Sequence, residues 1–273
     1  MDRVEQDNLA NRLRKFYDCE GKLDLQTPED WEIIKETSSQ RENIVIAMPI
    51  SPNDTVVEVD SSYGAITGAL AKKADKVYCV ENDISAREIC MMRHKENNIH
   101  YINLLSDIKE DFNTIVMMSP SHARLEEVLE TIPNNTQKEM KIIIACDNRF
   151  GLSYLNGYTA RGENRFQPIQ SRNNGDVRQY ALGELQTLLK RYHWIVEQVI
   201  YPYPDFMFTT EIFTDECLPK AGSLKNNERY SSELRFRMFD EDAAFDNVIQ
   251  AKEFTHFSNS FLVIAEKEEH IDE

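Results

Sequence analysis

Two acidic residues and one glycine mark the segment of this sequence that has the residues to bind a ligand. In the string VVEVDSSYGAITGAL, Glu58 lies at the end of an apolar run and Gly64 lies in the turn after it. The next apolar run ends in Glu81, 17 residues beyond Gly64. A carboxylate at a strand end can accept hydrogen bonds from two ribose hydroxyls, and free N–H groups at a helix start can hold a carboxylate or phosphate. Together these residues indicate a cofactor that contains a nucleoside.

Parallel strands are needed to bring these residues to one edge of a sheet, and the sequence has the matching pattern. Short apolar runs alternate with segments of helical length, which predicts βαβ units and an α/β protein of the doubly wound type. The expected strands are 55–59, 77–81, 100–105, 113–118, 141–146, 194–200 and 261–265. The expected helices of this alternation are 64–74, 85–97, 122–132, 182–192 and one after Asp240.

The remaining sequence predicts a helical cap and two insertions. Leu9, Leu13 and Phe16 recur at helical spacing, and Thr27 opens a typical helix start before Trp31. Segments without such periodicity follow the fifth and sixth expected strands, and long loops in compact domains are usually functional. The predicted organisation is a cap over 1–50, a cofactor-binding half over 51–146, and the rest of the same domain over 147–273, with insertions at 147–180 and 201–258.

The segment around Gly64 resembles class I S-adenosylmethionine-dependent methyltransferases. In that family an acidic strand end and a Gly-x-Gly-x-Gly turn hold the methionine part of the cofactor, and an acid at the end of the second strand holds the ribose. Glu58 matches the first acid, Gly64 the third glycine and Glu81 the ribose acid. The resemblance implies a Rossmann-like methyltransferase fold with a mostly parallel seven-stranded sheet, and S-adenosylmethionine as the cofactor.

The turn departs from this family pattern at two positions. Asp60 and Ser62 stand where the family has its first two glycines. Glycine is favoured there because it adopts unusual dihedral angles and lets the ligand approach the backbone. Asp60 also brings a negative charge near the cofactor's own carboxylate, unless it pairs with the ammonium group. Two alternatives stay open: Asp60, Ser62, Gly64 and Glu81 bind the cofactor, with weakened affinity, or the fold has lost it.

A narrower resemblance extends over most of the chain. It is to methyltransferase-type domains encoded with bacterial surface-polysaccharide enzymes, often beside or fused to glycosyltransferases. The strings that carry it are RENIVIAMPISPNDTVVEV, DNRFGLSYLNGY, YPYPDF, CLPKAGSL and FSNSFLVIAEK. This resemblance implies a role in making or decorating lipopolysaccharide or capsule, with a sugar or glycan intermediate as substrate. For a chain without cofactor, it implies an inactive module that binds or scaffolds a glycosyltransferase partner.

The first insertion supplies candidate substrate contacts. Residues 147–180 hold five arginines against three acidic residues, in a protein of net charge −16. One interpretation is a lid whose arginines bind phosphate or carboxylate and whose aromatic rings stack on sugars. An equally weighted alternative is a solvated loop that pairs with the acidic surface. The candidates from the lid interpretation are Arg149, Tyr154, Arg161 and Arg165.

Three further residues are candidates for the acceptor side of the reaction. His122 follows the fourth expected strand, and an imidazole can serve as a general base near neutral pH. Tyr203 and Asp205, in the string YPYPDF, could line an acceptor pocket. The favoured alternative for that string is packing of prolines and aromatics that stiffens an irregular segment.

Composition and missing motifs exclude several other classes of protein. The acidic charge opposes nucleic-acid binding, and an N/D-P-P-Y/F string typical of nucleic-acid methyltransferases is missing after the fourth expected strand. Neither a nicotinamide dinucleotide fingerprint nor a P-loop occurs. The five scattered cysteines have no C-x-x-C pair, which argues against disulfides and zinc. No apolar run is long enough to cross a bilayer, so we expect a cytoplasmic protein without membrane insertion.

Overall fold

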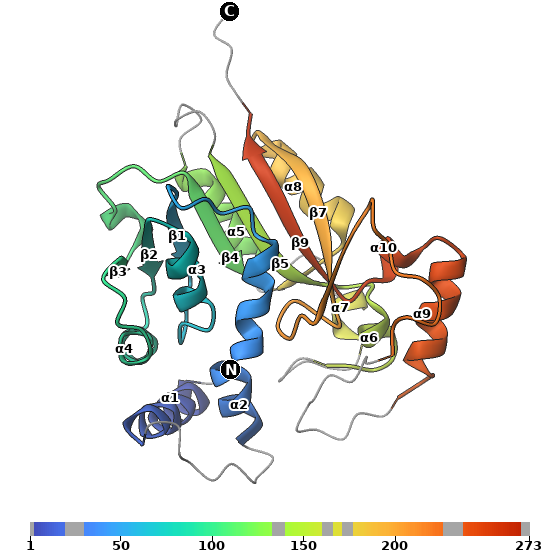
Figure 1. Cartoon of the computed structure of the whole chain (residues 1–273), viewed down its shortest axis with the longest axis horizontal. Helices are drawn as coiled ribbons and strands as arrows, with labels where there is room; N and C mark the ends of the chain where they lie inside the picture. The colour runs from blue at the N-terminus through green and yellow to red at the C-terminus, as the bar shows by residue number, and fades with distance from the viewer. Residues whose placement is uncertain are drawn as a thin grey trace, which may run out of the picture. The chain divides into compact units, whose positions relative to one another are not determined.

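The computed structural model describes residues 3–19, 30–132, 140–159, 166–170, 177–225 and 237–268. These residues fall into two compact units, one up to Val116 and one from Met117 onward. The domain boundaries expected at residues 50 and 146 stay predictions. The alternation of strands and helices expected from the sequence is confirmed, and with it the α/β class (Figure 1).

The first unit begins with helices that pack on each other and on the segment around Gly64. Their bounds are α1 (Arg3–Asp18), α2 (Trp31–Thr37) and the 3-10 segment η2 (Ser39–Ala47). Leu9 and Leu13 of α1 are buried in one cluster with Ile33 and Tyr63. The bulky Tyr63 side chain, which precedes Gly64, is therefore part of the core beneath α1. Thr27 lies outside the described residues.

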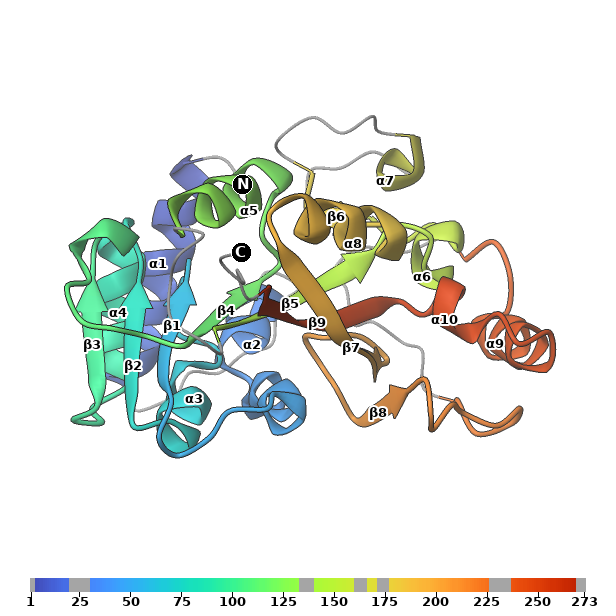
Figure 2. The ribbon, with the colours of Figure 1, turned by 90° about the horizontal axis from the view of Figure 1, so that it is seen from above.

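The strands of the first unit form a parallel arrangement. Figure 2 shows β1, β2 and β3 side by side, and β4 lies next to β1 in the strand order. Since the strand order moves in one direction from β1 to β3, right-handed crossovers place the two connecting helices on the same face. The elements are β1 (Thr55–Val59), α3 (Thr67–Lys73), β2 (Lys76–Val80), α4 (Ile84–Arg93), β3 (Ile99–Ile102) and η3 (Leu105–Asp107). The boundary between the two units falls within β4 (Thr114–Met118).

The second unit contains a mixed group of strands. Its helices are α5 (His122–Thr131), α6 (Leu152–Leu155), α7 (Gln167–Gln170), α8 (Leu182–Arg191), α9 (Glu241–Gln250) and α10 (Phe254–Phe257). Its strands after β4 are β5 (Lys141–Asn148), β6 (Gln179–Tyr180), β7 (Trp194–Tyr203), β8 (Glu211–Thr214) and β9 (Ser260–Lys267). β9 runs antiparallel to both β5 and β7, and β8 adds a further antiparallel edge (Figure 2).

The described strands number nine, and the seven expected from the sequence are among them. The additional strands are β6, which has two residues, and β8, which has four. Runs this short give no readable alternation of polar and apolar residues. No helix within the described ranges has the length and apolar character needed to cross a membrane.

Candidate functional site

The turn after β1 has a left-handed backbone at Asp60, Ser62 and Gly64. The φ angles are +54° at Asp60, +51° at Ser62 and +74° at Gly64. Left-handed conformations disfavour residues with a Cβ, by about 1–2 kcal/mol each, and such conformations concentrate at functional sites. Asp60 and Ser62 therefore adopt backbone conformations that glycine favours. The Asp60 and Ser62 residues are both exposed.

Glu81 joins the end of β2 to this turn through its carboxylate. Its Oε2 accepts a hydrogen bond from the backbone N–H of Ser62, and its Oε1 accepts one from that of Asp83, both at 2.8 Å. Glu81 is 8% exposed, and burial raises the pKa of its carboxyl while these two hydrogen bonds act to lower it. Each carboxylate oxygen can accept more than one hydrogen bond. Glu81 is thus a fixed acceptor at the end of β2, and its ribose role stays a prediction.

Gly64 is required here for two reasons. Its φ of +74° lies in the region that favours glycine, and a Cβ at this position would lie 2.5 Å from Cys90 Sγ. The backbone of the turn therefore approaches α4 more closely than a side chain allows. The Gly64 N–H donates to the carbonyl of Ser61 at 2.9 Å, which closes the turn.

Glu58 lies inside the first unit, with its carboxyl group directed at α3. Its Oε2 accepts a hydrogen bond of 2.6 Å from Thr67 Oγ1, and the residue is 2% exposed. Burial raises the pKa of Glu58 to about 8, so the group is mostly protonated at neutral pH. In this position Glu58 links β1 to α3, and its predicted role toward a cofactor stays a prediction.

His122 lies at the start of α5 in the second unit. Its ring stacks on that of Tyr180 with centroids 4.0 Å apart, and its Nε2 lies 3.4 Å from the carbonyl oxygen of Gln179. Burial lowers the pKa of His122, which favours the neutral imidazole that a general base requires.

Two more candidates contact the same glutamine. Arg149 Nη2 donates a hydrogen bond of 3.1 Å to the backbone carbonyl of Gln179 and lies 3.4 Å from a Glu184 carboxylate oxygen. Tyr154 accepts a hydrogen bond of 3.3 Å from the Gln179 amide and donates one of 2.9 Å to Asp147. The structure therefore brings His122, Arg149 and Tyr154 together around Gln179. No sequence signal marked Gln179, because its strand has two residues.

Arg161 and Arg165 lie outside the described residues. Tyr203 is 3% exposed and its ring meets that of Phe245 edge-on, with centroids 6.1 Å apart. Asp205 is 1% exposed and accepts hydrogen bonds from two backbone N–H groups that follow it, those of Met207 and Phe208. Both side chains thus have partners within the aromatic core and the segment itself.

The part of the chain that the structure describes contains no candidate metal site. Within it, no group of three or more His, Cys, Asp or Glu side chains is arranged to hold a metal ion. The five cysteines are free thiols, and Cys79, Cys90 and Cys146 are buried.

Comparison with known proteins identifies the fold. No protein-family model and no curated protein matches the chain. Among solved structures, a chain in the complex between a Haloferax volcanii methyltransferase activator and a protein assigned as a methyltransferase matches with a TM-score of 0.55 and 12% identity, covering 99% of both chains. Two further structures also match, each with a TM-score of 0.48. One is a protein from Listeria monocytogenes assigned as an S-adenosylmethionine-dependent methyltransferase, and the other is an S-adenosylmethionine-dependent methyltransferase from Mesorhizobium loti. Their identities are 12% and 11%; 85% of this chain is covered in each, with 98% and 100% of the other chains. The first likeness shows a methyltransferase-type fold, and at this identity the fold alone.

Proposed function

We propose that this protein binds S-adenosylmethionine at the turn after β1 and transfers its methyl group to a glycan intermediate. One observation carries the proposal: the Glu81 carboxylate is held at the end of β2 by the N–H of Ser62, which belongs to a turn with left-handed backbone at Asp60, Ser62 and Gly64. A strand-end carboxylate beside such a turn suits a nucleoside. The methyltransferase-type fold supports the same cofactor.

In this proposal Glu81 holds the ribose. Its oxygens keep acceptor capacity beyond the two backbone hydrogen bonds, and the two N–H partners prevent the carboxylate from rotating. The exposed Asp60 is suited to pair with the ammonium group of the methionine part. When bound, the cofactor supplies a methyl group on a sulfonium, and the protein's main task is to align the acceptor and exclude water.

The acceptor side of the proposal rests on the second unit. His122 is the first residue of α5, the helix that follows β4. Burial lowers its pKa, which favours the neutral imidazole that a base for a sugar hydroxyl requires. Arg149 and Tyr154 share Gln179 as a partner with His122, and an arginine suits a phosphate on an activated sugar. The narrower sequence resemblance supports a surface polysaccharide as the final product.

A second candidate function is a methyltransferase fold without activity that serves as a scaffold for a glycosyltransferase. The observation that favours it is the presence of Asp60 and Ser62 at glycine positions, because their side chains occupy space that glycine leaves to the ligand. In that case the same turn survives as structure, and the protein binds its partner instead of a nucleoside.

Calorimetry with S-adenosylmethionine and S-adenosylhomocysteine tests the first function. We expect binding to the wild-type protein, and at least tenfold weaker binding to Glu81→Gln, because the variant loses a charged acceptor for the ribose. Glu197→Gln, at an exposed position on β7, is the matched control and should bind like the wild type. No heat with either ligand at millimolar concentration would refute the cofactor site.

Co-purification distinguishes the second function. The scaffold proposal predicts a stable complex with a purified glycosyltransferase encoded beside this protein, unchanged in Glu81→Gln, and no binding of S-adenosylmethionine. A monomeric protein that does not bind this enzyme and that methylates a sugar acceptor would refute the scaffold proposal.

A further inference from the structure

The two glycines of the string GAITG lie against a single imidazole ring. An added Cβ at Gly64 would lie 3.0 Å from His94 Cδ2, and one at Gly68 would lie 2.7 Å from both Cε1 and Nδ1 of the same ring. Carbon atoms in good contact are about 3.5–4.0 Å apart, so neither position has room for a side chain. The spacing of these glycines thus creates a socket for His94.

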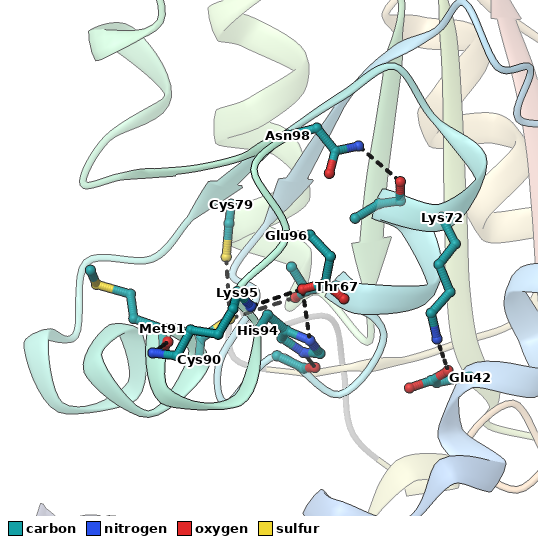
Figure 3. A network of polar contacts seen from close by, with 12 residues as sticks. Glu42, Thr67, Lys72, Cys79, Cys90, Met91, His94, Lys95, Glu96 and Asn98 are labelled. Atoms are coloured by element: carbon teal, nitrogen blue, oxygen red, sulfur yellow. Dashed lines mark hydrogen bonds and ion pairs between the residues drawn. The ribbon is translucent and has the colours of Figure 1, made fainter.

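His94 is held firmly by the backbone around it. It follows α4 directly; its N–H donates to the carbonyl of Cys90 at 3.0 Å, and its own carbonyl accepts a hydrogen bond of 3.3 Å from the Tyr101 hydroxyl. Its side chain is 7% exposed. Figure 3 shows the ring in the same polar network as Cys90 and Thr67. A ring fixed in this way can act as a rigid support for what it touches.

The ring of His94 makes one short hydrogen bond, to the cofactor turn. Its Nε2 lies 2.7 Å from the carbonyl oxygen of Gly64. A carbonyl oxygen only accepts, so Nε2 carries the proton. The charged groups near the ring are Glu96, whose Oε2 is 3.9 Å from Nδ1, together with Arg93 and Glu42. Burial lowers the pKa of His94, which keeps the ring neutral near pH 7 with its one proton available for Gly64.

We propose that His94 is a positioning residue for the cofactor turn. Its Nε2–H fixes the Gly64 carbonyl, and its ring fills the socket between Gly64 and Gly68. This holds the left-handed turn in the conformation that presents the Ser62 N–H to Glu81. His94 touches no reacting group and acts through Gly64. The link to cofactor affinity rests on the proposed function, whereas the effect on the turn does not.

Three variants test the role of His94. His94→Phe keeps an aromatic ring and removes the donor, His94→Gln restores an N–H donor at a similar reach, and His256→Phe changes an exposed histidine of α10 as the control. Hydrogen exchange is measured without ligand for the turn peptide 60–66 and, as an internal reference, for residues 142–146 of β5. Calorimetry then measures S-adenosylmethionine affinity.

We expect exchange in 60–66 to accelerate about tenfold in His94→Phe, the effect of one lost hydrogen bond, with residues 142–146 unchanged. His94→Gln should recover most of the difference, and cofactor affinity should follow the same order. Exchange that rises equally in both peptides, or a glutamine variant as impaired as phenylalanine, would overturn the proposal. A wild-type protein that binds no cofactor would refute the proposed function, while the exchange result still decides the role of His94.

Gly68→Ala is the second variant in case His94→Phe does not fold. Its methyl group enters the socket at 2.7 Å from the ring and displaces it while leaving every donor in place. Accelerated exchange in 60–66 supports the proposal, and an unchanged turn overturns it.

Discussion

Glu81 in the first unit and Asp205 in the second are both buried carboxylates that accept two backbone hydrogen bonds, and they differ in where the donors come from. For Asp205 both donors, Met207 and Phe208, follow it directly in the chain. For Glu81 one donor, Ser62, precedes it by 19 residues. Asp205 therefore stabilises a local turn, whereas Glu81 joins the end of β2 to the turn after β1. The comparison indicates that a polar group bridging distant segments is the better site candidate.

The same contrast separates the polar groups around these two residues. In the first unit, Glu58, Gly64 and His94 connect β1, α3, α4 and the turn across the chain. In the second unit, the ring of Tyr203 packs on Phe245 of α9, and the Asp205 carboxylate accepts hydrogen bonds from the turn that follows it. We expect substitutions in the first group to change the turn, and substitutions in the second to change folding stability alone.

The largest effect is expected from Glu58→Gln, and it depends on pH. Since the pKa of Glu58 is about 8 in the folded protein against an ordinary value of 4.5, the folded state keeps a proton that the unfolded chain releases. The stabilisation that this bound proton provides is complete below pH 4.5 and is lost as the pH rises through 8. Glutamine does not titrate. The free energy of unfolding of Glu58→Gln, relative to that of the wild type, should therefore increase by about 3 kcal/mol between about pH 4.5 and 7. Urea unfolding across this pH range measures the difference. Free energies of unfolding that change with pH in the same way for both proteins would contradict the prediction.

Asp205→Ala should destabilise the second unit by about 2–3 kcal/mol, because two partly buried N–H groups lose their hydrogen-bond acceptor. Asp205→Asn keeps one acceptor oxygen and should lose about half as much. Chemical denaturation measures both, and calorimetry should find S-adenosylmethionine affinity within twofold of the wild type. A tenfold fall in S-adenosylmethionine affinity would contradict the contrast between Asp205, which stabilises a local turn, and Glu81, which we propose binds the cofactor.

Gly64→Ala and Gly222→Ala separate backbone conformation from close packing. Both glycines have positive φ, +74° and +82°, so each alanine should cost about 1 kcal/mol. Of the two, Gly64 has neighbours within contact distance, Cys90 Sγ and the His94 ring, while Gly222 faces open space. We expect a loss of about 2 kcal/mol at Gly64, roughly twice that at Gly222. Equal losses in thermal unfolding would show that the turn does not depend on α4.

The smallest expected effects come from Gly68→Ala and Gly183→Ala, which should have opposite signs. Both glycines lie in helices, where alanine is favoured by about 0.5–1 kcal/mol. An alanine at Gly183 meets no atom within 4 Å and should stabilise the protein. At Gly68 it meets the His94 ring, and we expect a loss of about 1 kcal/mol. Thermal unfolding of the pair measures the difference, and a gain at both positions would contradict the socket for His94.

Local patterns were sufficient for the framework of the fold. The run from Thr55 to Val59 became β1 with the expected bounds, because a short β-branched stretch between turn residues has few other stable arrangements. The string after Asp240 became α9, where the Asp240 side chain caps the helix. Glu81 was recognisable because the end of a strand is set by the same local signals.

The sequence by itself therefore determined the order of strands and helices and the position of one acidic residue beside a glycine turn. Only the tertiary structure decided that Asp60 and Ser62 keep a left-handed backbone, that Gly64 and Gly68 form a socket for His94, and that Gln179 joins three candidate residues. Sequence patterns report preferences between neighbours in the chain. The contacts of the His94 ring with Gly64 and Gly68, and the contact of Gln179 with Tyr154, join residues 25 or more positions apart, and their geometry depends on how helices and strands pack.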